Sequence, residues 1–362
     1  MRAGKLKGML VVVLMIILTG CGLLTPGNDG DTPPPSTAAL DEEGYGEVKL
    51  AAVISGDIIP SPAGVAVNSA GQVYISDDVR QRLFVFSATD LNTPVGEIGE
   101  EGSGLGQFVH PREIVIDQED NLYVIDDGNS RIQKLSPTGE PLAVFGRRQE
   151  FSAYFSLEDG YDEPLSALGV DEEGNVYVGI SGAHYDISAH AVMKFSPSGE
   201  KIWTIESTLE GQIDLWPFAW PGALVLDPNK TLYLAHGANG VGKIMVLPQR
   251  DGRPTEEGAY DFGRMGKGPS ELMHTPAGIA LTAAGDILIA DTYNNRLQLF
   301  EPAGTAIAMY RLQGLDTVEF DRPGAISIAP DGSVFVVDEG NKRVLKLQLI
   351  PPAKPAGPVD CG

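Results

Sequence analysis

One segment of this chain occurs four times in nearly the same form. Residues 71–86 read GQVYISDDVRQRLFVF, and closely similar sequences occupy residues 120–135, 285–300 and 332–347. Two more divergent copies lie at residues 174–195 and 230–247. A repeat of this length constrains the fold more than any single residue does, because every copy must form the same small structural unit.

Each copy is predicted to be a four-stranded antiparallel sheet. A short apolar run, such as REIVI at 112–116, precedes a polar turn and two further runs, such as LYVI and RIQKL. Their β-branched and aromatic residues between Gly, Asn and Asp turns are typical of strands. A fourth run, such as PLAVFG at 141–146, closes several units. Six units at a spacing of roughly 50 residues predict an all-β, six-bladed β-propeller over residues 47–349.

The last unit ends after its third strand, near residue 349. The missing fourth strand has a counterpart at the other end of the chain, EVKLAAVISG at 47–56, which resembles the closing run of the other units. Pairing of the two would remove exposed strand edges. We therefore expect an N-terminal strand to close the ring.

Four units carry an Asp and an Arg that flank the hairpin between the second and third strands. An acid at the end of one strand and a base at the start of its partner can pair across the hairpin. Four copies of one pair cannot all form one active site, so we predict structural ion pairs. The pairs are Asp77 and Arg82, Asp126 and Arg131, Asp291 and Arg296, and Asp338 and Arg343.

This pattern resembles the NHL-repeat family. The resemblance rests on the Pro-x-x-[IV] entry, the LYV strand, the Asp-to-Arg hairpin and the Gly-rich joint GSGLGQFVHP at 102–111. It implies the propeller fold and leaves the function open, because the family includes binding scaffolds, and related propellers include lyases and lactonases.

Residues 1–20 are predicted to be a signal peptide, because basic residues precede a short apolar run at 9–18. The following sequence LTGC resembles the bacterial lipobox, in which cleavage leaves a lipidated cysteine, here Cys21, at the new N-terminus. We expect residues 21–46 to form a flexible tether and residues 350–362 a disordered tail, because their composition cannot bury a core. The expected location is the bacterial cell envelope, lipid-anchored and outside the cytoplasm.

An anchor of this kind could lie in either membrane of a Gram-negative cell. Gly22 follows the cysteine, where an Asp is the usual signal for retention in the inner membrane. The outer membrane is therefore favoured if the cell has one.

The chain has 362 residues and a formal net charge of −23, which opposes binding to nucleic acid. With 43% hydrophobic residues it can build a large core. The two Cys residues indicate no disulfide framework if Cys21 carries lipid. We expect a monomer without a cofactor.

Departures from the repeat gather in loops over units three and four, on the face that carries the links between blades and the second-to-third-strand hairpins. We call this the top face. Divergence inside a regular array favours a binding role, with local packing as the alternative. The predicted contact residues are Trp216, Phe218, Trp220, Tyr185 and Tyr154.

Unit two opens with Arg112 and Glu113, where the other first strands open with small residues. The first strand lines the central channel, so this pair could bind a ligand there or form an internal ion pair. His184, His190 and His236 are three further residues that could hold a metal if they converge, although their spacing does not support it.

Two functions follow. The first is a non-catalytic scaffold that binds a protein, a peptide or an envelope glycan through the top face. The second is a metal-dependent propeller enzyme of the lactonase or lyase type. Amidating-lyase propellers carry metal-binding His just after the entry proline, where this chain has residues such as Ala63, Arg112 and Gly222, and that departure counts against the second.

Overall fold

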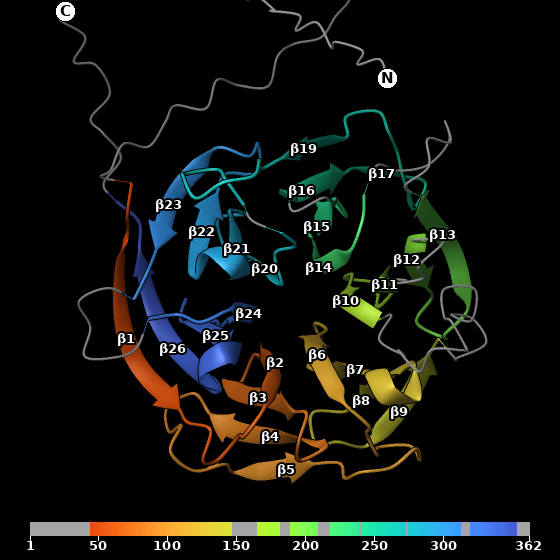
Figure 1. The fold of residues 1–362 in the computed structure, drawn as a ribbon. Helices are drawn as coiled ribbons and strands as arrows, with labels where there is room; N and C mark the ends of the chain where they lie inside the picture. Colours follow the sequence, from red (N-terminus) through yellow and green to blue (C-terminus); the bar gives the residue numbers. More distant parts are fainter. Residues whose placement is uncertain are drawn as a thin grey trace, which may run out of the picture. The chain divides into compact units, whose positions relative to one another are not determined.

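The predicted fold, an all-β six-bladed propeller, is confirmed. The computed structural model describes residues 44–146, 165–181, 189–208, 218–238, 241–272, 274–312 and 319–352. Six four-stranded antiparallel sheets surround a central channel, and in each sheet the first strand is innermost and the fourth is outermost (Figure 1). Within these residues no helix is both long enough and apolar enough to cross a membrane.

Five blades follow the chain in order from the inner to the outer strand. These are β2 (Pro62–Val67), β3 (Gln72–Asp77), β4 (Arg82–Ser87) and β5 (Gly96–Ile98) in blade 1; β6 (Pro111–Ile116), β7 (Leu122–Asp126), β8 (Arg131–Leu135) and β9 (Pro141–Phe145) in blade 2; β10 (Leu165–Val170), β11 (Val176–Ser181), β12 (Ala189–Phe195) and β13 (Lys201–Thr208) in blade 3; β14 (Pro221–Leu226), β15 (Leu232–Ala238), β16 (Val241–Leu247) and β19 (Tyr260–Phe262) in blade 4; and β20 (Gly278–Leu281), β21 (Ile287–Asp291), β22 (Arg296–Phe300) and β23 (Ala306–Tyr310) in blade 5. A small hairpin, β17 (Gln249–Arg250) and β18 (Arg253–Pro254), precedes β19.

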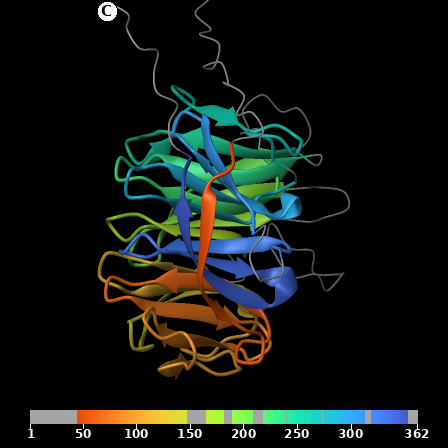
Figure 2. The same ribbon diagram turned by 90° about the vertical axis from the view of Figure 1, so that its left-hand side faces the viewer.

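The sixth blade combines the two ends of the described chain. It contains β24 (Pro323–Ile328), β25 (Val334–Asp338), β26 (Arg343–Ile350) and, as its outer strand, β1 (Glu47–Ile54). The register of β1 on β26 runs from Glu47 opposite Ile350 to Ile54 opposite Val344. Figure 2 shows β1, in orange-red, lying along β26 in blue. The expected closure of the ring by an N-terminal strand is thus confirmed.

The core lies between the blades. Six clusters of buried apolar side chains each join one blade to the next, so the repeat buries its hydrophobic surface only against its neighbours. One example packs Ile125 of blade 2 against Val178 of blade 3.

Several hairpins on the top face have the same backbone conformation. Three of them contain a single 3₁₀ turn, η1 (Asp127–Asn129), η3 (Thr292–Asn294) or η4 (Glu339–Asn341), that ends in a left-handed residue. These residues are Ser130, Asn295 and Lys342, with φ of 50°, 51° and 51°. The arginine predicted to form the ion pair follows directly, so the turn places it opposite its aspartate.

Glycines let the innermost strands approach closely. A Cβ on Gly64 would lie 2.3 Å from the Arg112 carbonyl oxygen, and one on Gly278 would lie 2.2 Å from that of Gly324. At these glycine positions the backbones of neighbouring first strands meet directly, with no room for a larger side chain between them.

Candidate functional site at the mouth of the central channel

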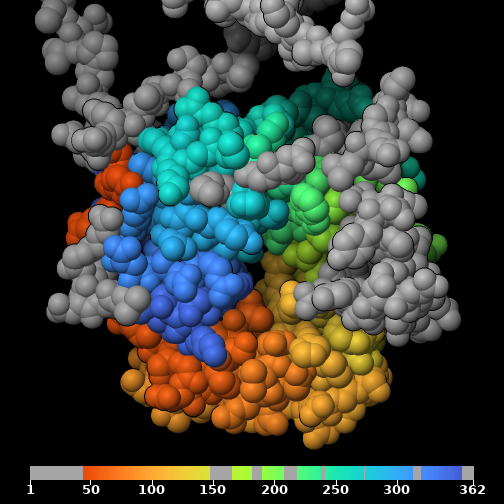
Figure 3. All heavy atoms as spheres, in the orientation of Figure 1, coloured from red at the N-terminus to blue at the C-terminus, as the bar shows by residue number. Residues whose placement is uncertain are grey.

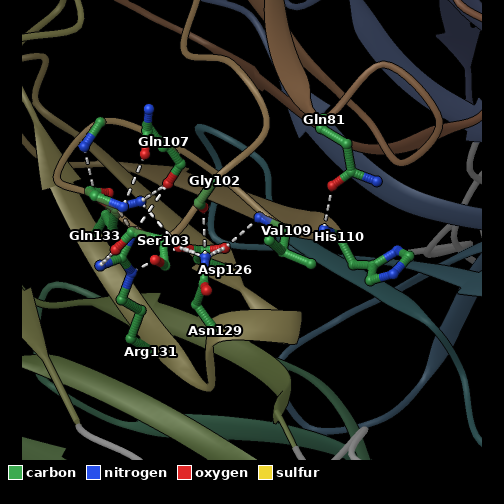
Figure 4. Close-up of polar contacts among 12 residues, drawn as sticks. Gln81, Gly102, Ser103, Gln107, Val109, His110, Asp126, Asn129, Arg131 and Gln133 are labelled. Atoms are coloured by element: carbon green, nitrogen blue, oxygen red, sulfur yellow. Dashed lines mark hydrogen bonds and ion pairs between the residues drawn. The ribbon is translucent and has the colours of Figure 1, made fainter.

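The Asp–Arg pair of blade 2 connects two blades as well as two strands. Arg131 Nε lies 2.6 Å from Asp126 Oδ2. The guanidinium also donates to the carbonyl oxygens of Ser103, Gly104 and Gln107, which belong to the Gly-rich joint arriving from blade 1 (Figure 4). The ion pair therefore holds the joint in place.

Blades 5 and 6 repeat this arrangement. Arg296 Nε lies 2.8 Å from Asp291 Oδ2, and both side chains are fully buried. Arg343 Nε lies 2.7 Å from Asp338 Oδ2. In blade 5 the guanidinium again donates to carbonyl oxygens of the preceding joint, including those of Gly268 and Glu271.

The pair predicted in blade 1 is absent, which corrects the sequence interpretation. Asp77 and Arg82 are opposite each other in register, but Arg82 forms an ion pair with Glu97 on the outer strand β5. Asp77 instead accepts backbone N–H groups of Ser61, Val79 and Arg80. The outer-strand acid competes for the arginine, and the loop amides satisfy the aspartate without it.

In blades 3 and 4, the described residues at the equivalent positions form no Asp–Arg pair. Register places Ile180 opposite Ala191 in blade 3 and His236 opposite Lys243 in blade 4. His236 and His190 are almost completely buried, and neither imidazole has a hydrogen-bond partner within the described ranges. Burial lowers the pKa of both imidazoles to about 4, so they are neutral near pH 7.

Two aromatic residues of the predicted contact set differ sharply in position. Phe218 is 1% exposed and packs in the core between blades 3 and 4, with its ring near His236. It is therefore a core residue, and its predicted role as a surface contact is wrong. Trp220 is 41% exposed, and its ring lies 5.3 Å from that of His190. Five predicted residues lie outside the described residues: Trp216, Tyr185, Tyr154, His184 and Cys21.

A cavity of about 440 Å³ opens on the top face at the mouth of the channel. Figure 3 shows a hollow at the centre of the face, bordered by the blue strands of blade 6 and the orange strands of the first two blades. Other blades contribute small residues to it, such as Ala63 of β2, Gly222 of β14 and Ala277 just before β20. Arg112 and Glu113 of β6 are the large charged exceptions among these first strands.

Arg112 and Glu113 reach into this cavity but do not pair with each other in the way expected of an internal ion pair. Arg112 Nε lies 3.3 Å from the buried Asp127 Oδ2. The Leu168 N–H of blade 3 donates to Glu113 Oε2 over 2.8 Å. Glu113 is partly accessible from the channel, yet enclosure by protein raises the pKa of its carboxyl to about 8, a shift that the Leu168 hydrogen bond opposes. Glu113 is therefore largely protonated at pH 7.

Blade 6 supplies charged residues at the rim that sequence reasoning missed, namely Arg322, Glu339 and Lys342. Arg322 has φ of 52°, and its N–H donates to Asn295 Oδ1 over 2.9 Å. Glu339 is exposed, but desolvation of its carboxyl raises its pKa, while nearby Arg322 and Arg112 oppose the shift. The sequence offered one signal for Arg322: it directly precedes the entry proline of its unit, the position that Trp220 occupies in blade 4.

Aromatic side chains line a second cavity, which adjoins the first on the side of blades 4 and 5. This cavity, also of about 440 Å³, is lined by Trp220, His274 and Tyr293 and shares Arg322 and Glu339 with the first. The rings of His274 and Tyr293 lie 4.6 Å apart, and Tyr293 is 56% exposed. The two cavities together form one concave surface with apolar, cationic and carboxyl groups, which we call the channel mouth.

The part of the chain that the structure describes contains no group of three or more His, Cys, Asp or Glu side chains placed to hold a metal ion. His190 and His236 lie on different blades, and each is packed against aromatic rings. The described residues of the channel mouth offer charged and aromatic contacts to a ligand instead.

Comparison with known proteins agrees with this architecture. Residues 63–143 match a family model described as a 6-bladed beta-propeller, and residues 273–300 match the NHL repeat. The chain is 26% identical to mouse NHL repeat-containing protein 3 over 56% of its own length and 59% of that protein. It is 22% identical to the human E3 ubiquitin-protein ligase TRIM32 over 78% of its own length and 47% of that protein.

A third relative is the chloroplastic protein SUPPRESSOR OF QUENCHING 1 of Arabidopsis thaliana, with 24% identity over 70% of this chain and 27% of that protein. The chain thus spans less than two thirds of each of these relatives. Among solved structures, a Xanthomonas campestris gluconolactonase matches with a TM-score of 0.56 and 15% identity, covering 81% of this chain and 86% of that one. Such a match shows a shared fold.

Proposed function

We propose that this NHL-repeat β-propeller is a binding scaffold that holds a protein or peptide partner on its top face, centred on the channel mouth. The observation that carries the proposal is the exposure of Trp220 and Tyr293 beside a charged cavity. Trp and Tyr offer large rigid contact area at low entropic cost, and they dominate the binding energy of many interfaces.

Other top-face loops support a broad contact surface. Val79, Leu105 and Met265 are 62–66% exposed and lie in the hairpin of blade 1 or in the Gly-rich joints. Exposed apolar residues around a concave centre are typical of protein-binding faces. The net charge of −23 on the chain as a whole opposes binding to nucleic acid.

The test is capture of partners from an envelope extract by the purified full chain. The double variant Trp220→Ala/Tyr293→Ala should lose a specifically retained protein while its melting temperature changes little. Tyr260→Ala is a matched control, because Tyr260 is also 41% exposed but lies on the outer strand of blade 4. Equal retention by all three proteins would exclude the channel mouth as the binding surface.

The scaffold would be held at the bacterial envelope through lipid on Cys21, a proposal that rests on the basic, apolar and LTGC segments of residues 1–21. Cys21→Ser should release the protein from the membrane fraction or leave its precursor uncleaved. A Cys21→Ser protein that still matures and sediments with membranes would rule the anchor out.

A further inference from the structure

The channel mouth has a different charge balance from the rest of the molecule. Its first cavity is lined by three cationic side chains, Arg112, Arg322 and Lys342, and by three acidic ones, Asp78, Glu113 and Glu339, whereas the chain as a whole carries a net charge of −23. Glu113, on the wall of the same cavity, is largely protonated at pH 7 because burial raises its pKa to about 8. With Glu113 neutral, three cations face two carboxylates, so the cavity offers an anion a more favourable potential than the acidic remainder of the molecule does.

Arg322 is held much more loosely than the arginines of the ion pairs. Its Nε lies 3.9 Å from Asp321 Oδ1, and its side chain is 57% exposed. In contrast, Arg131 and Arg296 lie 2.6 and 2.8 Å from their aspartates, with side chains 13% and 0% exposed. Among the described residues, Arg322 thus has no close ion pair, and its exposed guanidinium can donate two hydrogen bonds to a carboxylate at little cost.

The local backbone positions Arg322 for this role. Left-handed backbone is uncommon for residues other than glycine, and here it is fixed by the Asn295 side chain from the hairpin of the neighbouring blade. Trp220, which also precedes an entry proline, has φ of 40° and lines the adjoining cavity with Arg322. The same backbone position thus supplies a cation from blade 6 and an aromatic ring from blade 4.

We propose that the channel mouth is a carboxylate-binding pocket that receives an acidic side chain from a peptide segment of the partner, with Arg322 as the principal contact. Lys342 and Arg112 line the same cavity, and Glu113 presents its carboxyl deeper in it. Trp220 and Tyr293 pack against an apolar residue next to the acidic one. This inference rests on the proposed function and names the chemistry that the mouth selects.

The dimensions favour a short segment. A cavity of about 440 Å³ accommodates one or two side chains and cannot admit a folded domain. The two charged carboxylates of its lining already have cationic or polar neighbours: Asp78 Oδ1 lies 2.7 Å from His110 Nδ1, and Glu339 is near Arg322 and Arg112.

The experiment is isothermal titration calorimetry of the purified full chain in detergent with defined probes. The acidic probe is the N-acetylated, C-amidated tetrapeptide Gly-Glu-Phe-Gly, and the neutral probe replaces Glu with Gln. We expect the acidic peptide to bind at least tenfold more tightly than the neutral one. Equal binding of the two peptides, or binding of neither, would overturn the proposal.

Variants locate the binding on the structure. Arg322→Gln should weaken the acidic peptide about tenfold, which corresponds to about 1.4 kcal/mol, and leave the neutral peptide unaffected. Arg250→Gln is the matched control, because Arg250 is also an exposed arginine beside an acid but lies outside both cavities. Lys342→Gln provides a second substitution in the cavity if Arg322→Gln proves unstable. Loss of binding in Arg250→Gln to the same extent would mean that general charge, and not the pocket, attracts the peptide.

Two further outcomes separate this inference from the function on which it rests. If Arg322→Gln retains the captured partner that Trp220→Ala/Tyr293→Ala loses, the scaffold stands and the carboxylate pocket fails. Trigalacturonate serves as a carbohydrate probe with the same functional group. Tighter binding of trigalacturonate than of the acidic peptide would show that the mouth selects an acidic glycan and would refute the peptide assignment.

Discussion

The four equivalent arginines of the repeat predict a graded series of stabilities. We consider the substitution of each by Met, which keeps the aliphatic stem and removes the guanidinium. The side chains of Arg82, Arg131, Arg343 and Arg296 are 34%, 13%, 10% and 0% exposed. The repeat thus holds one sequence position constant while its burial changes.

The expected loss of unfolding free energy depends on which polar groups lose their partner when the guanidinium is removed. Arg296→Met strands the fully buried Asp291 carboxylate and frees carbonyl oxygens of the joint, including those of Gly268 and Glu271. Loss of one partner of a buried pair typically costs about 3–5 kcal/mol. Asn294 and Gln298 still donate to Asp291, which favours the lower end of that range. Arg82→Met breaks a surface pair with Glu97, for which about 0–1 kcal/mol is expected.

The assay is urea denaturation of the four variants and the wild type, followed by both fluorescence and circular dichroism, because coincidence of the two probes tests whether unfolding is two-state. We expect Arg296→Met to be the least stable, Arg131→Met and Arg343→Met to be intermediate, and Arg82→Met to resemble the wild type. The reasoning is refuted if Arg82→Met loses as much stability as Arg296→Met.

Three other predictions concern pH and ring closure. His190 and His236 have folded-state pKa values of about 4, below the ordinary 6.5, so the unfolded state binds more protons between these pH values. Stability should therefore fall as the pH drops from about 6.5 to 4. In urea unfolding, the midpoint of His236→Leu should fall less steeply with decreasing pH than that of the wild type. Glu113 has a folded-state pKa of about 8, above the ordinary 4.5, so it should destabilise the folded state increasingly as the pH rises from 4.5 to 8. Glu113→Gln should therefore gain stability relative to the wild type over that interval. A difference in unfolding free energy between the two proteins that stays constant with pH would contradict the protonated carboxyl. Deletion of residues 47–56 removes β1 and exposes the edge of β26, so the melting temperature should fall or the protein should aggregate. Deletion of residues 22–43, which stops before the backbone contacts of Gly44 and Gly46 with Met309, should change the melting temperature little. Similar losses from both deletions would contradict this role for β1.

The repeat made the fold predictable, because the same apolar and turn pattern had to be satisfied six times. The position of β1 also followed, since a blade with three strands leaves an unpaired edge. Failure of the pair in blade 1 could not be foreseen, because Glu97 lies on another strand and only the register brings it near Arg82. Sequence spacing identifies which residues can meet across a hairpin and does not rank their competing partners.

The candidate site was less predictable than the fold for a geometric reason. Arg322, Tyr293 and Arg112 are far apart in sequence and lie on blades 6, 5 and 2, and only the curvature of the ring brings them to one mouth. Phe218 and Trp220 are both aromatic and two residues apart, yet Phe218 is buried and Trp220 is exposed. The left-handed backbone at Trp220 changes the direction of the chain at that point. The pattern of apolar residues in the sequence does not predict such a turn.

The pairing of β1 with β26 also has a consequence for how the molecule is made. Glu47 and Ile350 are about three hundred residues apart, so this contact closes the longest loop in the fold and carries a large loss of chain entropy. During synthesis β1 emerges first and has no partner strand until nearly the whole propeller has followed. We therefore infer that the final blade forms last and sets the rate of folding, since contacts distant in sequence are slow to form. Until then both strands present open edges, and the nascent chain is most vulnerable to aggregation in the interval before its two ends meet.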